Sequence, residues 1–209
     1  MSTVPPELPR VLHFVTGGFS GATQVAVDLV RAHGESGLFD SLLVLRRKRQ
    51  TDPVRIAALR AQGLAVEVVP GWSHAATMWQ LVRLCRKFRP DLLVAHGFSE
   101  HLWGRYAGLI ARVPRLVQVE HNSRERYTRW RQAQMLWLAR RTQAIVGVSQ
   151  GVREALLARG VDPSKTLAIP NGIRLEPYAQ AHEHPYASRE PGIVMAARFA
   201  RQKDHASLL

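Results

Sequence analysis

Two histidines follow directly on short apolar runs of the kind that form buried strands. His96 ends LLVAH, and His121 follows LVQVE. In an open α/β sheet, ligands bind beyond the carboxyl ends of the parallel strands, where a histidine can exchange hydrogen bonds with a substrate. We take His121 as the stronger candidate for a catalytic contact and His96 as a candidate substrate contact. The alternative for either residue is a histidine that only caps backbone groups at a strand end.

A glycine-rich segment, TGGFSGATQ, joins the first apolar run to the first helical segment. Such a loop turns tightly and leaves N–H groups and a positive helix end free to bind a phosphate. Its glycines do not fit G-x-G-x-x-G, and LRRKRQ stands where an acid for a ribose would be expected. The pattern argues against NAD and leaves NADP open through Arg46 and Arg47. A simple tight turn is the alternative for Gly17 and Gly18.

A second pair of residues suited to anion binding lies near the end of the sequence, in IVMAARFARQKD. Arg198 follows a short apolar run, and Lys203 falls in the first turn of the helix that we expect next. Side chains at these two places can clamp an anion against a helix N-terminus. A solvated loop would have the same composition.

Metal and disulfide chemistry are not expected. Glu100 and His101 lie close to His96 in sequence, but their spacing matches no metal-binding motif, so we predict no metal site. Cys85 is the single cysteine and falls among apolar neighbours, which is typical of a core thiol. The absence of a disulfide framework favours a reducing compartment, and no apolar leader or membrane-length run is present. We expect a cytoplasmic protein.

The strong positive charge is the main compositional feature. The chain has 29 Lys and Arg against 16 Asp and Glu, a net charge of +13 over 209 residues. Three kinds of partner would suit this charge: nucleic acid, an anionic membrane or a phosphorylated ligand. No nucleic-acid-binding motif or aromatic stacking surface accompanies it, so a basic nucleic-acid-binding module is kept only as an alternative.

The elements that must position these residues alternate between strands and helices. Eight short apolar runs predict strands, at 11–15, 42–45, 65–69, 92–96, 116–119, 144–148, 166–170 and 193–197. Helical periodicity separates them, for example in SQGVREALLARG, where Ser149 is a candidate N-cap and Gly160 a stop. This alternation predicts an α/β fold with a Rossmann-like parallel sheet and helices on both faces.

The alternation breaks once and so divides the chain. Residues 173–191 are rich in proline and in charges of both signs, which is typical of a linker. We therefore predict a first domain over 1–172, a linker over 173–191, and over 192–209 the first strand, loop and helix of a second Rossmann-like domain that is cut short.

One predicted helix, from His74 to Phe88, has a distinctive outer face. A core stripe repeats at helical spacing in Met78, Leu81, Val82 and Cys85. The opposite face then carries Trp79, Arg83, Arg86 and Lys87. A tryptophan among cations suits an anionic membrane surface. The alternative is a solvated face on which the tryptophan lies over arginine stems.

The order of these segments is more specific than any one of them. The glycine loop, FRPDLLVAHG, VEHN, IVGVSQGVREALLARGVDPSKTLAIPNGI and AARFARQKD together resemble glycosyltransferase family 4, from about Val11 to Leu209. The resemblance implies a retaining transferase with the two-domain GT-B fold. It implies a nucleotide-sugar donor, a glycan, lipid-linked or small-molecule acceptor, and no metal or other cofactor. Some lipid-modifying members of the family dock on membranes through a helix like the one from His74 to Phe88, which would place this protein at the inner face of the membrane.

The resemblance also implies roles for individual residues. Gly17 and Gly18 match the loop near the donor diphosphate, and His121 matches the histidine that contacts the transferred sugar. Arg198 and Lys203 match the basic pair that binds the pyrophosphate, where fixed cations would stabilise the charge on the leaving group. The segment Pro170–Asn171–Gly172 makes Asn171 a further candidate substrate contact.

The sequence departs from the family pattern in several places. Ala197 and Asp204 replace glycines that are common around the basic pair, and Phe19 and Ser20 precede Gly21 in the first loop. The family's carboxylate pair and its pocket for the base and ribose belong to the second domain. We therefore expect the 209-residue chain alone to bind nucleotide-sugars weakly and to transfer nothing. An NADP-dependent oxidoreductase is kept as a further alternative.

Overall fold

The computed structural model describes residues 7–123 and 127–173, and beyond them residues 175, 176, 179, 187, 190, 192–197 and 204–207. The chain divides into two compact units, Met1–Gly172 and Ile173–Leu209. The first unit is an α/β domain built around a parallel sheet, which confirms the predicted fold class.

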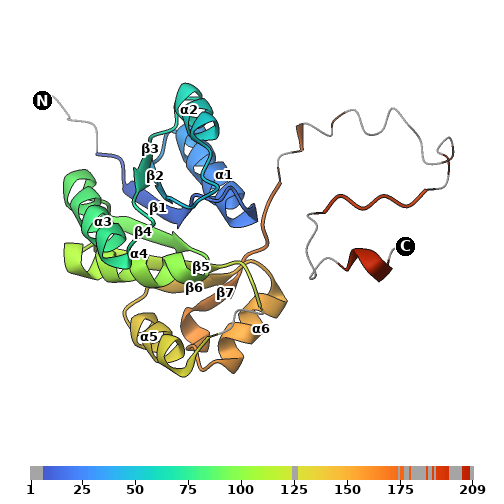
Figure 1. Cartoon of the computed structure of the whole chain (residues 1–209). Helices are drawn as coiled ribbons and strands as arrows, with labels where there is room; N and C mark the ends of the chain where they lie inside the picture. The colour runs from blue at the N-terminus through green and yellow to red at the C-terminus, as the bar shows by residue number, and fades with distance from the viewer. Residues whose placement is uncertain are drawn as a thin grey trace, which may run out of the picture. The chain divides into compact units, whose positions relative to one another are not determined.

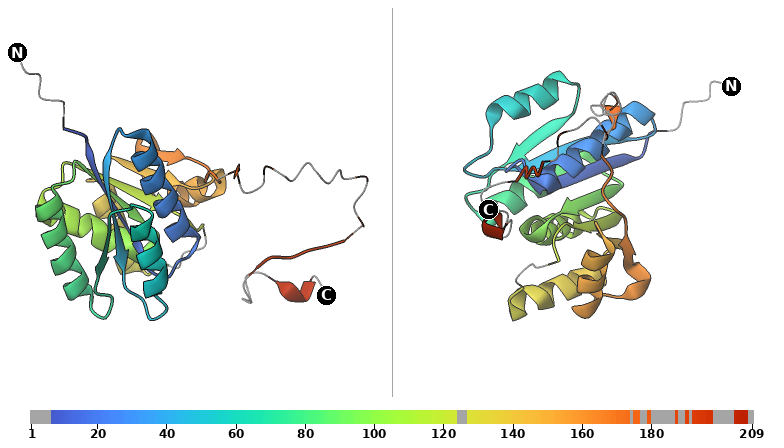
Figure 2. Two further views of the ribbon diagram at one scale, coloured as in Figure 1. Left: turned by 90° about the horizontal axis from the view of Figure 1, so that it is seen from above. Right: turned by 90° about the vertical axis from the view of Figure 1, so that its right-hand side faces the viewer.

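The sheet of the first unit has seven strands in the order β3-β2-β1-β4-β5-β6-β7. Every neighbouring pair is parallel. The strands are β1 (Arg10–Thr16), β2 (Asp40–Arg46), β3 (Val66–Val69), β4 (Leu92–His96), β5 (Arg115–Glu120), β6 (Ala144–Gly147) and β7 (Thr166–Ala168). The chain runs outward from β1 in one direction and, after β3, returns to begin again at β4 (Figure 2). The order therefore reverses between β1 and β4, which is where open α/β sheets bind their ligands.

The helices of the first unit cover both faces of the sheet. They are α1 (Gly21–Ser36), α2 (Pro53–Ala61), α3 (His74–Phe88), α4 (Phe98–Ala111), α5 (Arg129–Ala139) and α6 (Gln150–Ala158), with a short 3-10 turn at Pro163–Lys165. α1 and α2 lie on one side of the strands, and α3 and α4 lie on the other (Figure 1). α5 and α6 pack with α4 over β6. Of the described helices, none is long and apolar enough to cross a membrane.

Strand alternation explains these layers. Leu12 and Phe14 of β1 face α3 and α4, whereas Val15 faces α1 and α2. α4 lies close to the sheet because Gly104 has no side chain. A Cβ there would stand 2.8 Å from the Cβ of Ala95 and 2.9 Å from a ring carbon of Phe14. Ser149 caps α6 as predicted, since its hydroxyl accepts the N–H of Val152 at 3.2 Å.

The second unit differs from expectation in its described part. Residues 192–197 form no strand, so the eighth predicted strand at 193–197 is wrong for this chain. Ile193 and Val194 are 85% and 93% exposed. The physical reason is that a parallel strand needs a paired neighbour and cover on both faces, and the described residues of the second unit supply neither. Near the end, His205–Ser207 form one 3-10 turn.

Candidate functional site

The glycine loop that follows β1 is held in place by the end of β2. The N–H of Gly17 donates to the carbonyl of Arg46 at 2.7 Å. A Cβ on Gly17 would stand 2.7 Å from that same oxygen and 2.8 Å from Oγ1 of Thr51, so no larger residue fits there. Gly18 is less constrained, because its N–H makes only a long bond of 3.4 Å to Oγ1 of Thr16. Of the two predicted glycines, Gly17 fixes the loop and Gly18 keeps an N–H that a ligand could take.

The start of α1 is also prearranged. Oγ1 of Thr23 accepts the N–H of Ser20 at 3.2 Å and donates to the carbonyl of Thr16 at 2.9 Å. Phe19 adopts a φ of 49°, which is uncommon for a residue with a side chain. The departure from the family pattern noted at Phe19 is therefore a bend in the loop that leads into the helix. It directs the phenyl ring against the core beneath α1 and α2, with the guanidinium of Arg55 5.4 Å from the ring centroid.

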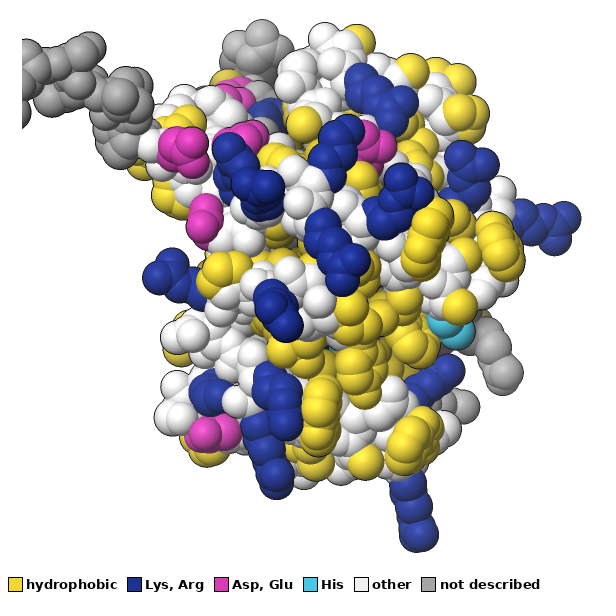
Figure 3. Space-filling model, turned by 90° about the vertical axis from the view of Figure 1, so that its left-hand side faces the viewer, with side chains coloured by type: hydrophobic (Ala, Val, Ile, Leu, Met, Phe, Trp, Pro, Cys, Tyr) yellow, Lys and Arg dark blue, Asp and Glu magenta, His cyan; other side chains and the backbone are white. Residues whose placement is uncertain are grey.

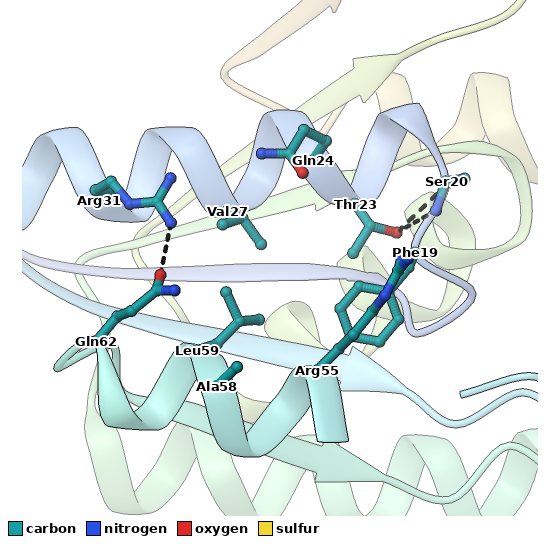
Figure 4. Close-up of a pocket in the computed structure, with 10 residues that line it drawn as sticks. All are labelled: Phe19, Ser20, Thr23, Gln24, Val27, Arg31, Arg55, Ala58, Leu59 and Gln62. Atoms are coloured by element: carbon teal, nitrogen blue, oxygen red, sulfur yellow. Dashed lines mark hydrogen bonds between the residues drawn. The ribbon is translucent and has the colours of Figure 1, made fainter. Parts of the chain in front are cut away.

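A groove of about 350 Å³ lies between α1 and α2, beside this bend (Figure 4). Phe19 and Ser20 close one end, and a hydrogen bond of 2.8 Å from Arg31 to Gln62 crosses the other. Neither Gly17 nor Gly18 lines it. The groove is therefore separate from the loop surface that would meet a diphosphate.

The predicted histidines lie together, and a third one joins them. Nδ1 of His96 is 3.4 Å from Nε2 of His121, and Nε2 of His96 is 3.1 Å from Nδ1 of His13 on β1. The three rings form a row across β1, β4 and β5, on the face of the sheet that α1 and α2 cover. His13 and His96 are buried, and His121 is partly exposed at the outer end of the row.

Burial keeps these rings uncharged. It lowers the pKa of His13 to about 3, with a further contribution from His33, and it lowers the pKa of His121 to about 4. The pKa of His96 is also lowered well below its usual value, by burial first and by the two neighbouring histidines second. A neutral imidazole offers one donor and one acceptor nitrogen. At neutral pH, His121 is therefore suited to hydrogen-bonding a ligand rather than to carrying positive charge.

Arg46 was one of the two arginines that kept NADP binding as an alternative, but its guanidinium already has partners within the protein. Its guanidinium lies 3.5 Å from Oε1 of Glu100 and 3.0 Å from Nδ1 of His74. Glu100 also pairs with Lys48 at 3.0 Å and accepts a hydrogen bond from Ser99 at 2.8 Å. Arg46 is buried in this cluster, whereas Arg47 is exposed. A buried and paired guanidinium is poorly placed to receive a ribose phosphate.

Glu100 and His101 point into different networks. His101 bonds Arg105 and Tyr127 on the other side of α4 from the Arg46 cluster. In the described part of the chain, no group of three metal-ligating residues is close enough to hold an ion. His13 was not predicted as a site residue, because it lies in the middle of a strand and meets His96 only through the pairing of β1 with β4.

The basic face of α3 has the predicted division. Leu81, Val82 and Cys85 are buried, whereas Trp79 is 61% exposed with the guanidinium of Arg83 4.7 Å from its ring centroid. Arg86 and Lys87 are exposed beside them. The face of the molecule that carries α3 and α4 shows many cations around hydrophobic side chains and few acids (Figure 3).

The structure adds a matching feature on α5 that the sequence analysis did not identify. Trp137 is 44% exposed, and the guanidinium of Arg141 lies 3.8 Å from its ring centroid. Tyr106 of α4 packs against Trp137 and against Trp103, and Trp103 stacks on His74 at the start of α3. An aromatic row therefore connects α3, α4 and α5 along the outer side of the sheet.

The remaining predicted residues cannot be compared with this site. Arg198 and Lys203 lie outside the described residues. Asn171 is exposed near the end of the first unit, and no hydrogen bond of its side chain is found in the part that the structure describes. Their assignment as ligand contacts stays a prediction.

Comparison with known proteins places the chain in a family. The sequence model of Glycosyltransferase Family 4 matches residues 19–177. No curated protein matches the chain in sequence. Among solved structures, Anabaena HepE in complex with UDP is 20% identical with a TM-score of 0.66, covering 82% of this chain and 46% of that chain.

Two further solved structures show the same fold. A glycosyltransferase from Rickettsia africae is 12% identical with a TM-score of 0.71, covering 87% of this chain and 48% of that chain. The lipopolysaccharide outer core galactosyltransferase WaaB is 12% identical with a TM-score of 0.60, covering 79% and 47% respectively. The chain therefore spans about half the length of the solved structures that it matches.

Proposed function

Because the chain belongs to glycosyltransferase family 4, we propose that it forms the acceptor-side half of an enzyme that transfers a sugar from a nucleotide-sugar to an acceptor. The observation that supports this most directly is the meeting of His96 with His121 at the carboxyl ends of β4 and β5. The glycine loop follows β1, which pairs with β4, so all three features share one edge of the sheet. Solved structures of similar fold that hold UDP support a uridine diphosphate sugar as the donor.

The proposed roles follow from the charges that change during transfer. Negative charge accumulates on the diphosphate as the glycosidic bond breaks, and preorganised donors there stabilise the transition state. The N–H of Gly18 and the N-terminus of α1 would face that charge, with Arg198 and Lys203 adding fixed cations. His121 would hydrogen-bond the sugar, with Asn171 as a further substrate contact. His96 was predicted as a substrate contact too, but it is buried with both ring nitrogens engaged by His13 and His121, so it would act only through His121. We propose retention of the anomeric configuration and no metal or other cofactor.

A transfer assay tests this function. A form of the protein that includes a complete donor-binding domain is mixed with a panel of UDP-, GDP- and ADP-sugars and with saccharide, lipid-linked and small-molecule acceptors. We expect a glycosylated product of retained configuration from at least one UDP-sugar. Transfer from no nucleotide-sugar, together with a fluorescence change on mixing with NADPH, would contradict the proposal and favour an oxidoreductase.

We further propose that the acceptor side works at the inner face of a membrane. Two exposed tryptophans with stacked arginines, Trp79 with Arg83 and Trp137 with Arg141, provide aromatic anchors beside cations. Tryptophan settles at the headgroup level, and each cation near an anionic surface contributes about 1 kcal/mol. Such a surface would hold the domain at the membrane that carries a lipid-linked acceptor.

Vesicle sedimentation separates this docking from general electrostatic attraction. The triple change Arg83→Gln, Arg86→Gln and Lys87→Gln should reduce binding to vesicles that contain anionic lipid, and salt should weaken binding of the parent protein. The matched control changes the exposed Arg47, Arg49 and Arg55 to Gln, which removes the same charge from the loop after β2 and from α2. Equal loss of binding in both triples would leave only non-specific attraction.

A further inference from the structure

The histidine row has a direction that fixes the hydrogens of all three rings. Each contact joins Nδ1 of one ring to Nε2 of the next, from His13 to His96 and from His96 to His121. Each contact needs one N–H and one lone pair. A neutral imidazole carries a single N–H, so the position of the proton on one ring determines it on the next.

The rings stay neutral because burial disfavours the charged form of each imidazole. Burial is the first cause of the lowered pKa in each of them, and neighbouring histidines lower the pKa of His13 and His96 further. Only two arrangements are therefore possible for the row. Either every ring carries its hydrogen on Nδ1, or every ring carries it on Nε2.

The inner end of the row distinguishes these arrangements. Nε2 of His13 is buried and has no hydrogen-bond partner in the described part of the structure. With hydrogens on Nε2, this atom would be a buried N–H without an acceptor. With hydrogens on Nδ1, it would be a lone pair without a donor. Buried N–H groups without partners are rarer in folded proteins than acceptors without partners, so the arrangement with hydrogens on Nδ1 is favoured.

We propose that His13 and His96 are positioning residues that hold His121 as the Nδ1–H tautomer, so that this ring offers a ligand a hydrogen-bond donor and not a base. His96 occupies Nε2 of His121, and Nδ1 is the nitrogen left for a ligand. The ligand group that it meets must then be an acceptor oxygen, such as a sugar oxygen or a phosphate oxygen. The proposal rests on the proposed function only for the identity of that ligand.

His33 provides a matched comparison. Its ring centroid lies 5.4 Å from that of His13, but its Nδ1 bonds the hydroxyl of Ser41 at 2.7 Å, and it makes no hydrogen bond to the row in the described structure. A change at His33 therefore alters an imidazole next to the row without removing a link in it. A change at His96 should therefore alter the tautomer of His121, whereas a change at His33 should not.

The test is nuclear magnetic resonance of the ring nitrogens in the 209-residue chain at pH 7. The signals of His121 are identified by their loss in His121→Gln. We expect a neutral ring with its hydrogen on Nδ1, and we expect His96→Phe to move the hydrogen to Nε2, the form that a free histidine side chain prefers in water. His33→Gln should leave the tautomer of His121 unchanged.

Three results would overturn the proposal: a hydrogen on Nε2 in the parent chain, a charged ring at pH 7, or a tautomer that His96→Phe does not change. If His96→Phe does not fold, His96→Leu takes its place, and the spectrum of the parent chain decides alone if neither folds.

A second readout separates this proposal from the proposed function. In the transfer assay, His96→Phe should lower kcat about 10-fold and leave the KM for the nucleotide-sugar within about twofold, because positioning residues act through the group they hold. An Nδ1–H tautomer in a protein that transfers nothing would refute the transferase and leave the positioning role intact. Transfer by a protein whose His121 carries its hydrogen on Nε2 would refute the positioning role and leave the transferase intact.

Discussion

Tyr127 joins two buried groups whose hydrogen bonds have only one possible direction. Arg105 is a donor only, so Nδ1 of His101, 2.7 Å from its guanidinium, must accept. Nε2 of His101 then carries the hydrogen and donates to the hydroxyl of Tyr127 at 2.7 Å. The hydroxyl in turn donates to Oε2 of Glu120 at 3.3 Å. One phenolic oxygen thus connects a buried cation to a buried carboxylate.

Tyr127→Phe removes both bonds and leaves the rest of the ring in place. His101 and Glu120 are 0% and 2% exposed, so water cannot replace the lost oxygen. Glu120 keeps its hydrogen bonds from Gln118 and from the N–H of His121. Nε2 of His101 loses its partner, and a buried polar group in that position costs about 1–3 kcal/mol. For a folded unit of this size, each kcal/mol shifts the Tm by about 2–4 °C. We therefore expect Tyr127→Phe to lower the Tm by about 2–12 °C.

Tyr106→Phe is the control for this substitution. The hydroxyl of Tyr106 makes one hydrogen bond, to Gln134 at 3.1 Å, and the residue is only partly buried. Its loss should cost about 1 kcal/mol or less. Thermal unfolding of both variants followed by circular dichroism makes the comparison. Equal shifts in Tm would refute the directed network, since they would show that the hydroxyl of Tyr127 contributes no more than a surface hydroxyl.

The other two predictions concern the row and the packing of α4. Burial lowers the pKa of His13 to about 3, so between pH 6.5 and 3 the unfolded chain binds a proton that the folded chain excludes. The free energy of unfolding, measured by urea titration, should therefore decrease as the pH is lowered through this range. The decrease should be less steep in His13→Phe. Gly104→Ala should destabilise the protein by about 1–3 kcal/mol through overpacking against Ala95 and Phe14, whereas Gly151→Ala, with nothing within 4 Å, should not; equal urea midpoints would contradict this.

The main features of the first unit could be predicted because they depend on local sequence patterns. Short apolar runs separated by helical periodicity predict parallel strands, and the strands found at β1 to β7 follow them. The proximity of His96 and His121 was also predictable, since the carboxyl ends of neighbouring parallel strands share one edge.

The features that the sequence did not predict depend on strand register and on long-range contacts. His13 joins the row only because β1 pairs with β4, and no local pattern gives that pairing. Arg46 was considered as a phosphate ligand, but α4 and the start of α3 bring Glu100 and His74 to it. The run at 193–197 has the composition of a strand, yet composition does not supply the neighbours that a strand needs.

The measurement that tests the central claim most directly is the turnover of His121→Ala in a form of the protein with a complete donor-binding domain. If His121 contacts the transferred sugar, turnover of the nucleotide-sugar should fall about 100-fold or more, while the affinity for UDP stays within about threefold of the parent protein. His33→Ala, which changes a neighbouring imidazole outside the hydrogen-bonded row, should keep parental turnover. Parental turnover in His121→Ala would contradict the account and remove this histidine from the site.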